Sequence, residues 1–109
     1  MEDNRRYLEG IREELYKIHN GEIADEDGNT YTFWDYIADN VLYLNYIINA
    51  DKTYRAVELC IGFGGPNVYI NTRSQEIELF WGIDHESIWL PSEICEELDD
   101  IYYEFYSES

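Results

Sequence analysis

The sequence predicts an α+β protein in which a three- to four-stranded antiparallel meander sheet is packed by an N-terminal helix, a buried central helix and a C-terminal acidic helix. Two observations carry this prediction. Residues 54–81 contain three short runs in which apolar and polar side chains alternate, as in strands with one buried face. The segments on either side have apolar residues at helical spacing. With 109 residues and 45% hydrophobic residues, the chain has the size and composition of a single domain over residues 1–109.

The predicted sheet has one apolar face and one acidic face. Turn-forming residues, such as Gly64-Gly65-Pro66, separate its alternating runs. Glu58, Glu76 and Glu78 alternate with apolar residues, so we expect them on the face that meets water. The expected strands cover residues 57–63, 67–71, 76–81 and 87–90, with a turn over 82–86 before the last strand.

Three helices are expected around this sheet. Apolar residues at positions i, i+3, i+4 and i+7 predict a helix over 3–19, and the next run predicts a small hairpin turning at Asp27-Gly28. Thr32-Phe33-Trp34-Asp35 is similar to a capping box and precedes a strongly apolar run. We therefore expect a central, buried helix that ends near Asn49-Ala50-Asp51. Pro91-Ser92 begins the last predicted helix, whose core stripe is Ile94, Leu98, Ile101, Tyr102 and Phe105.

Charge is the most unusual property of the sequence. There are 24 Asp plus Glu residues against 7 Lys plus Arg, which gives a formal net charge of −17. No Lys or Arg follows Arg73, whereas eleven acidic residues do. Because such a surface repels phosphates, we expect neither direct nucleic-acid binding nor attachment to an anionic membrane, and we expect a basic partner, of which nucleic-acid-binding proteins are the commonest kind. The alternative is that the charge serves only to keep the protein soluble.

The C-terminal helix concentrates this charge on one face. Its acidic residues recur every three or four positions, so they form a row that advances roughly 5 Å per step. That spacing is on the scale of the roughly 3.4 Å axial rise per phosphate of a DNA strand, so the row could imitate nucleic acid. We expect a partner-binding surface made of Glu93, Glu96, Glu97, Asp100, Glu104 and Glu108, supported by Glu76 and Glu78 of the sheet and by Asp84 and Glu86 of the turn.

Eleven tyrosines are many for this length. Tyrosine combines apolar area with a polar tip and is frequent at interface hot spots, where it can stack on arginine. We include Tyr69 and Tyr103 in the expected partner-binding surface. The tyrosines expected to be partly exposed are Tyr16, Tyr36, Tyr43, Tyr46, Tyr69, Tyr103 and Tyr106.

Motifs for catalysis or metal binding are weak. The run Asp25–Asn29 lacks the acids that an EF-hand loop requires at its first and last positions. Asp84-His85-Glu86 are adjacent and do not converge easily on one ion, and His19 is expected to end its helix without a special role. We therefore expect no catalytic site, no metal and no cofactor. With two cysteines, no Cys-x-x-Cys motif and no signal or membrane-spanning segment, we expect a cytoplasmic protein with free Cys60 and Cys95 thiols.

Two segments carry a resemblance to known proteins. The runs 64–72 and 77–82, followed by the acidic terminal helix, resemble small proteins of bacterial phages and mobile elements. In size and charge the chain is similar to the anti-CRISPR and antirestriction inhibitors that imitate DNA. This resemblance implies a non-enzymatic inhibitor that occupies the basic DNA groove of a defence nuclease, with a Cas9-type effector favoured. Members of this class have unrelated folds, so the resemblance implies a mechanism rather than an architecture.

Two other functions stay open at this point. An immunity protein or antitoxin that neutralises a basic nuclease toxin would have similar size and acidity. A generic acidic protein-interaction domain would also fit, although its acids should be spread evenly along the chain. The sequence leaves the oligomeric state open between monomer and homodimer.

Overall fold

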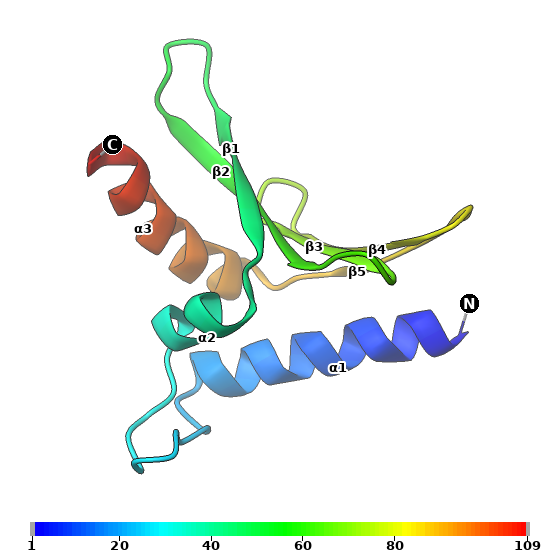
Figure 1. The fold of residues 1–109 in the computed structure, drawn as a ribbon. Helices are drawn as coiled ribbons and strands as arrows, with labels where there is room; N and C mark the ends of the chain where they lie inside the picture. Colours follow the sequence, from blue (N-terminus) through cyan, green and yellow to red (C-terminus); the bar gives the residue numbers. More distant parts are fainter. Residues whose placement is uncertain (1, 109) are drawn as a thin grey trace.

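In the computed structural model, which describes residues 2–108 and the side chains from residue 3 on, three helices lie against one antiparallel sheet (Figure 1). The α+β class predicted from the sequence is confirmed. The sheet has five strands rather than the three or four expected. The helices are α1 (Glu2–His19), α2 (Phe33–Asn40) and α3 (Ser92–Glu108), and the strands are β1 (Tyr43–Ile48), β2 (Tyr54–Gly62), β3 (Asn67–Asn71), β4 (Glu76–Trp81) and β5 (Asp84–Trp89).

The sheet is a simple meander in which each strand pairs with the next, in the order β1-β2-β3-β4-β5. Local side chains fix its turns. The Asn71 side-chain oxygen accepts hydrogen bonds from the backbone N–H groups of Arg73 and Ser74, at 2.9 and 3.0 Å, and so closes the β3–β4 turn. The β4–β5 turn has only two residues, because Trp81 pairs with Asp84. Gly82 takes the positive φ of 60° that this turn needs.

The expected long central helix is wrong in its second half. The capping box at Thr32 is confirmed, with the Asp35 carboxylate accepting from the Thr32 N–H at 2.9 Å, but α2 ends at Asn40. The Asn40 side chain donates to the Tyr36 carbonyl, and Val41 then takes extended backbone angles. Beyond it, a run of β-branched and aromatic residues forms β1 instead. α2 is also less buried than expected, because Trp34 is half exposed.

Three smaller predictions need correction. The fourth predicted strand, 87–90, is β5 and begins at Asp84, so the predicted turn over 82–86 is too long. The first predicted strand begins earlier and ends at Gly62, which leaves Phe63 exposed in the following loop. The hairpin predicted around Asp27-Gly28 contains a single bridge, between Ala24 and Thr30.

The core lies between the helices and one face of the sheet. α1 packs against β4 and β5, and α3 packs against β2, on the same side of the sheet (Figure 1). Of the predicted α3 core stripe, Phe105 is 41% exposed and lies at the margin, whereas the other four residues are buried. No helix of residues 2–108 covers the opposite face of the sheet. The core includes Leu8, Leu15, Val57, Leu59, Ile70, Ile77, Leu79, Ile88, Ile94, Leu98 and Tyr102.

A buried polar contact fixes α3 on the sheet. The Asp99 carboxylate accepts hydrogen bonds from the Tyr54 hydroxyl at 2.6 Å and from the Thr72 hydroxyl at 2.8 Å. Thr72 is 5% exposed, and its oxygen also accepts from the Val57 N–H at 2.9 Å. Desolvation and the Asp99 carboxylate both raise the pKa of Tyr54, so the phenol remains a donor. This contact sets the rotation of α3 and thereby which side chains face outward.

Candidate functional site

The outer side of α3 carries most of the acids predicted to bind a partner. The helix turns Ile94, Leu98 and Ile101 toward the sheet, so residues on the opposite side meet solvent. α3 contains no Lys or Arg. At 1.5 Å rise per residue, neighbouring acids along the exposed side are separated by about 4.5–6 Å along the axis. The exposed acids of α3 are Glu93, Glu96, Asp100, Glu104 and Glu108.

Glu97 differs from the other acids of the predicted row. Its carboxylate lies 2.7 Å from the Nδ1 atom of His19, the last residue of α1, and its side chain is 44% exposed. The contact connects the end of α1 to α3. His19 therefore has a structural partner that the sequence did not predict, and Glu97 is only partly available to a partner protein.

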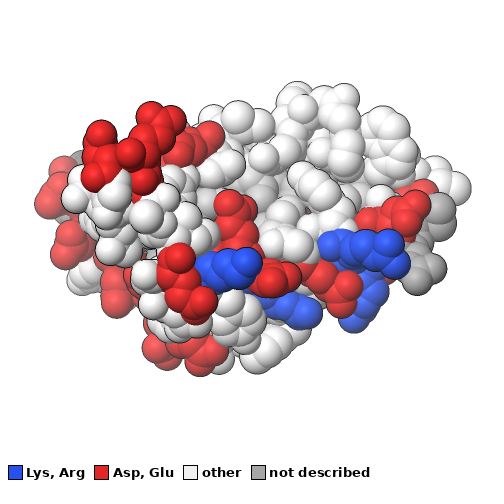
Figure 2. All heavy atoms as spheres, turned by 90° about the horizontal axis from the view of Figure 1, so that it is seen from below, with Lys and Arg blue, Asp and Glu red and all other residues white. Residues whose placement is uncertain are grey.

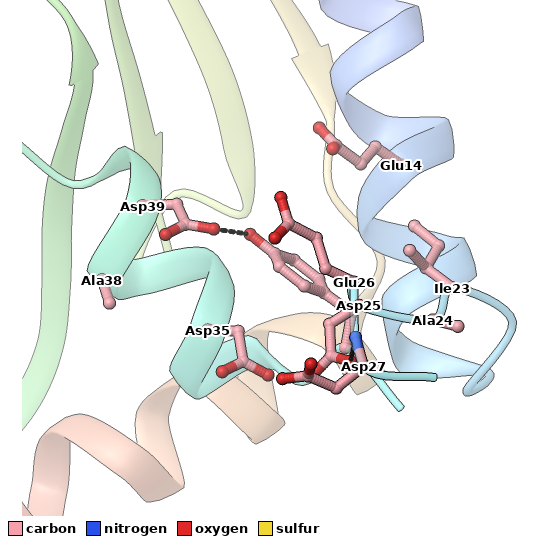
Figure 3. Close-up of a pocket in the computed structure, with 10 residues that line it drawn as sticks. Glu14, Ile23, Ala24, Asp25, Glu26, Asp27, Asp35, Ala38 and Asp39 are labelled. Atoms are coloured by element: carbon pink, nitrogen blue, oxygen red, sulfur yellow. Dashed lines mark hydrogen bonds between the residues drawn. The ribbon is translucent and has the colours of Figure 1, made fainter. Parts of the chain in front are cut away.

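A second group of acids, which sequence analysis did not assign to a site, lies between α1, α2 and the loop that connects them (Figure 3). These residues line an open pocket of about 600 Å³. The Tyr31 hydroxyl donates to Asp39 at 2.7 Å, and desolvation together with this carboxylate raises the pKa of Tyr31 to about 12. The acids of the pocket are Glu14, Asp25, Glu26, Asp27, Asp35 and Asp39.

The two groups of acids lie at the same end of the molecule. α2 packs against α3 through Trp34 and Phe105, whose rings lie 5.3 Å apart in an edge-to-face arrangement. Figure 2 shows the largest areas of Asp and Glu toward the left, where α2, α3 and the connecting loop lie in Figure 1, while Lys and Arg lie along α1. We call this surface the acidic end, defined as Glu93, Glu96, Asp100, Glu104 and Glu108 with Asp25, Glu26, Asp27, Asp35 and Asp39.

The acids of the sheet are not part of the acidic end. Glu76 and Glu78 point to the face of the sheet that no helix of residues 2–108 covers, as predicted, whereas α3 packs on the other face. Asp84 and Glu86 were expected in a turn, but they are β5 residues that pair with Trp81 and Leu79, on the helix-covered face. The predicted partner-binding residues therefore form at least two separate surfaces, because the sheet lies between them.

The tyrosines pack mainly against one another. Tyr103 is 56% exposed beside α3's acids, and its ring lies 6.0 Å from that of Tyr54. Tyr69 is half-buried on the uncovered sheet face, so the two tyrosines predicted to bind a partner lie on different surfaces. Tyr36 was expected to be partly exposed and is buried. Tyr36 lies three residues after the buried Phe33, so the two share the face of α2 that packs on the core, whereas the expected buried face was drawn through Trp34 and Ile37.

Across residues 2–108, no three His, Cys, Asp or Glu side chains are grouped as metal ligands. Cys60 and Cys95 are buried free thiols, and burial raises the pKa of Cys95 to about 12. None of the helices in residues 2–108 has the length and apolar character needed to cross a membrane.

Comparison of the chain with protein-family models, curated proteins and solved structures gives no match.

Proposed function

We propose that the protein is a non-enzymatic inhibitor of a nucleic-acid-binding defence nuclease and that the acidic end occupies the basic groove that normally takes DNA. A Cas9-type effector is the favoured target, since its PAM-binding arginines and positively charged channel offer the chemistry that this surface needs. The observation that carries the proposal is the row of five exposed carboxylates on α3, a helix without a single Lys or Arg. The resemblance to DNA-mimicking inhibitors of phages and mobile elements agrees with it.

The rigidity of α3 supports this role. A mimic of DNA has to present its charges at fixed spacing, because ordering a flexible chain on binding costs free energy. Buried side chains and the hydrogen bonds of Asp99 hold α3 against the sheet. Its outward carboxylates are therefore arranged before the partner arrives.

The acids of the α1–α2 loop extend the charged surface beyond one helix. Together with a net charge of −17, they produce a long-range field that would accelerate association with a basic groove. Binding of this kind weakens as salt rises, because exposed charges are screened within about 10 Å at 0.1 M ionic strength.

Charge reversal on α3 tests the proposal. We expect Glu96→Lys, Asp100→Lys and Glu104→Lys, combined, to weaken binding to a guide-loaded Cas9-type effector by at least ~100-fold, as for several lost charge contacts in one interface. Glu97 is left intact because it holds His19. The matched control reverses Asp3, Glu9 and Glu13, which are exposed on α1 and change the net charge equally. Equal affinities of the two variants, both folded by circular dichroism, would contradict a specific role for α3.

A further inference from the structure

The uncovered face of the sheet is a second surface with its own chemistry. We define the open face as the side of the sheet that carries Glu58, Tyr69, Glu76, Glu78, Phe80 and His85, which the strand register places together. Three of these residues are carboxylates, and none of them is Lys or Arg. The open face also carries large exposed rings, since Tyr43, Phe80 and Trp89 are 42%, 39% and 56% exposed.

The acids of the open face lie next to aromatic side chains on the same face. Tyr69 is paired directly with Glu78 across β3 and β4, and Asn71, two residues along, lies between Glu58 and Glu76. The Tyr69 ring lies 5.9 Å from that of Phe80. Phe80 in turn stacks on His85, with ring centroids 4.5 Å apart and planes 9° from parallel. Flat rings therefore lie beside carboxylates from two different strands.

Among the described residues, these carboxylates contact two neutral groups and one histidine. Glu76 accepts a hydrogen bond from the Ser87 hydroxyl at 2.9 Å, Glu58 accepts from the Asn45 amide at 3.5 Å, and Glu78 lies 3.5 Å from the His85 Nε2 atom. Burial, and then the charge of Glu76, raise the pKa of Glu78, although His85 acts in the opposite direction. A cation brought to this face would relieve that repulsion.

We propose that the open face docks an arginine-bearing segment of a protein partner, with guanidinium groups stacked on the Tyr69 and Phe80 rings and paired with the carboxylates of Glu58, Glu76 and Glu78. Arginine fits better than lysine because its planar group stacks on aromatic rings and binds carboxylates with two parallel hydrogen bonds. The proposal does not depend on the acidic end, which lies on the other side of the sheet.

Charge complementarity decides between possible occupants. A second copy of the chain would bring Glu58, Glu76 and Glu78 against the same three acids, which is unfavourable. Nucleic acid would bring phosphates to them and would be repelled. A basic protein segment is the occupant that neutralises the acids and covers the exposed rings together.

Titration of the ¹⁵N-labelled protein with an arginine–glycine repeat peptide, and with a lysine–glycine peptide of equal length, tests the proposal at about 0.15 M salt. We expect amide shifts centred on β3, β4 and β5, and affinity for the arginine peptide at least ~3-fold higher than for the lysine peptide. The combined variant Glu58→Gln, Glu76→Gln and Glu78→Gln should bind the arginine peptide at least ~10-fold more weakly. The control variant Glu96→Gln, Asp100→Asn and Glu104→Gln should retain those shifts.

Amide shifts confined to α3 and the α1–α2 loop would overturn the proposal and leave the inhibitor function standing. Equal affinities for the arginine and lysine peptides would also overturn it. An unchanged affinity for the arginine peptide in the Glu58→Gln, Glu76→Gln and Glu78→Gln variant would do the same. If that variant does not fold, Glu78→Gln alone carries the test, with a loss of at least ~3-fold expected for one pair.

Discussion

Thr72 and Asp99 show how single residues determine which surface α3 presents. Thr72 is buried between β2 and α3, and its hydroxyl connects the Val57 N–H to the Asp99 carboxylate. Asp99 belongs by sequence to an acidic run, yet its side chain is a structural acceptor rather than part of the exposed row. The spacing of the acids along α3 already places Asp100, and not Asp99, in the predicted row. The hydrogen bonds of Asp99 to Tyr54 and Thr72 could not be predicted, because they depend on how α3 packs on the sheet.

Replacing the Thr72 hydroxyl tests this structural role. Thr72→Val should lower the free energy of unfolding by about 1–3 kcal/mol, because it leaves the buried Val57 N–H without its acceptor and removes a donor to Asp99. Urea denaturation measures the change. The control, Thr30→Val at an exposed position, should change stability by less than about 0.5 kcal/mol. Similar losses in both variants would mean that the Thr72 hydroxyl has no special role.

Glu78 gives a prediction with a defined pH dependence. Its pKa is raised from the ordinary 4.5 in the folded protein, so the ionised form is disfavoured on folding. The resulting loss of stability exists above the folded pKa and disappears as pH falls below the unfolded value. Glu78→Gln should therefore stabilise the free protein at pH 7–8, by about 1 kcal/mol or less. The advantage over the wild type should shrink toward zero near pH 4, as followed by urea denaturation. An advantage that grows as pH falls would show that Glu78 is stabilised as the anion.

At the scale of secondary structure, the sequence predicted α1, α3 and the β2–β4 meander because each has a clear period and a turn signal. The segment 41–48 was assigned to a helix because its apolar residues satisfy helical and strand patterns alike. Pairing with β2, which no local pattern reports, decides in favour of a strand. The same limit applies to the site. The row on α3 could be predicted, but the approach of the 25–39 acids to α3 depends on tertiary packing.

The capping box of α2 offers a test at this scale. Asp35→Ala should destabilise the protein by about 1 kcal/mol, because the carboxylate accepts from the Thr32 N–H at the helix start. Asp27→Ala is the matched control, since Asp27 is exposed, lines the same acidic pocket and lies outside α2. Either substitution removes one negative charge from the same pocket, so the difference between the two urea midpoints measures the capping hydrogen bond. Equal midpoints for the two variants would contradict a stabilising role for the cap.

At the scale of the whole molecule, the charge is distributed unevenly over a small fold. The acidic end gathers carboxylates from α3, α2 and their neighbouring loop, while Lys and Arg lie mainly along α1 in the view of Figure 2. Repulsion within the acidic end opposes folding, and a basic partner would remove it. The fold thus separates the surface that we assign to the nuclease from the open face.

This repulsion predicts a salt response. Raising NaCl from about 0.05 to about 0.5 M should increase the thermal midpoint, because the acids are then screened from one another. The combined variant Glu96→Gln, Asp100→Asn and Glu104→Gln should have a higher thermal midpoint than the wild type at low salt. Its midpoint should rise less when NaCl is added. Scanning calorimetry measures both. A midpoint that is independent of salt in the wild type would mean that the acidic end is too dispersed to repel itself.

Capture of a guide-loaded Cas9-type effector by the tagged protein, with and without saturating target DNA, tests the central claim most directly. If the acidic end takes the place of DNA, the effector should be captured without DNA and excluded once DNA fills the groove. Capture that is equal in both conditions, or no capture of the effector at moderate salt, would contradict DNA mimicry at this target.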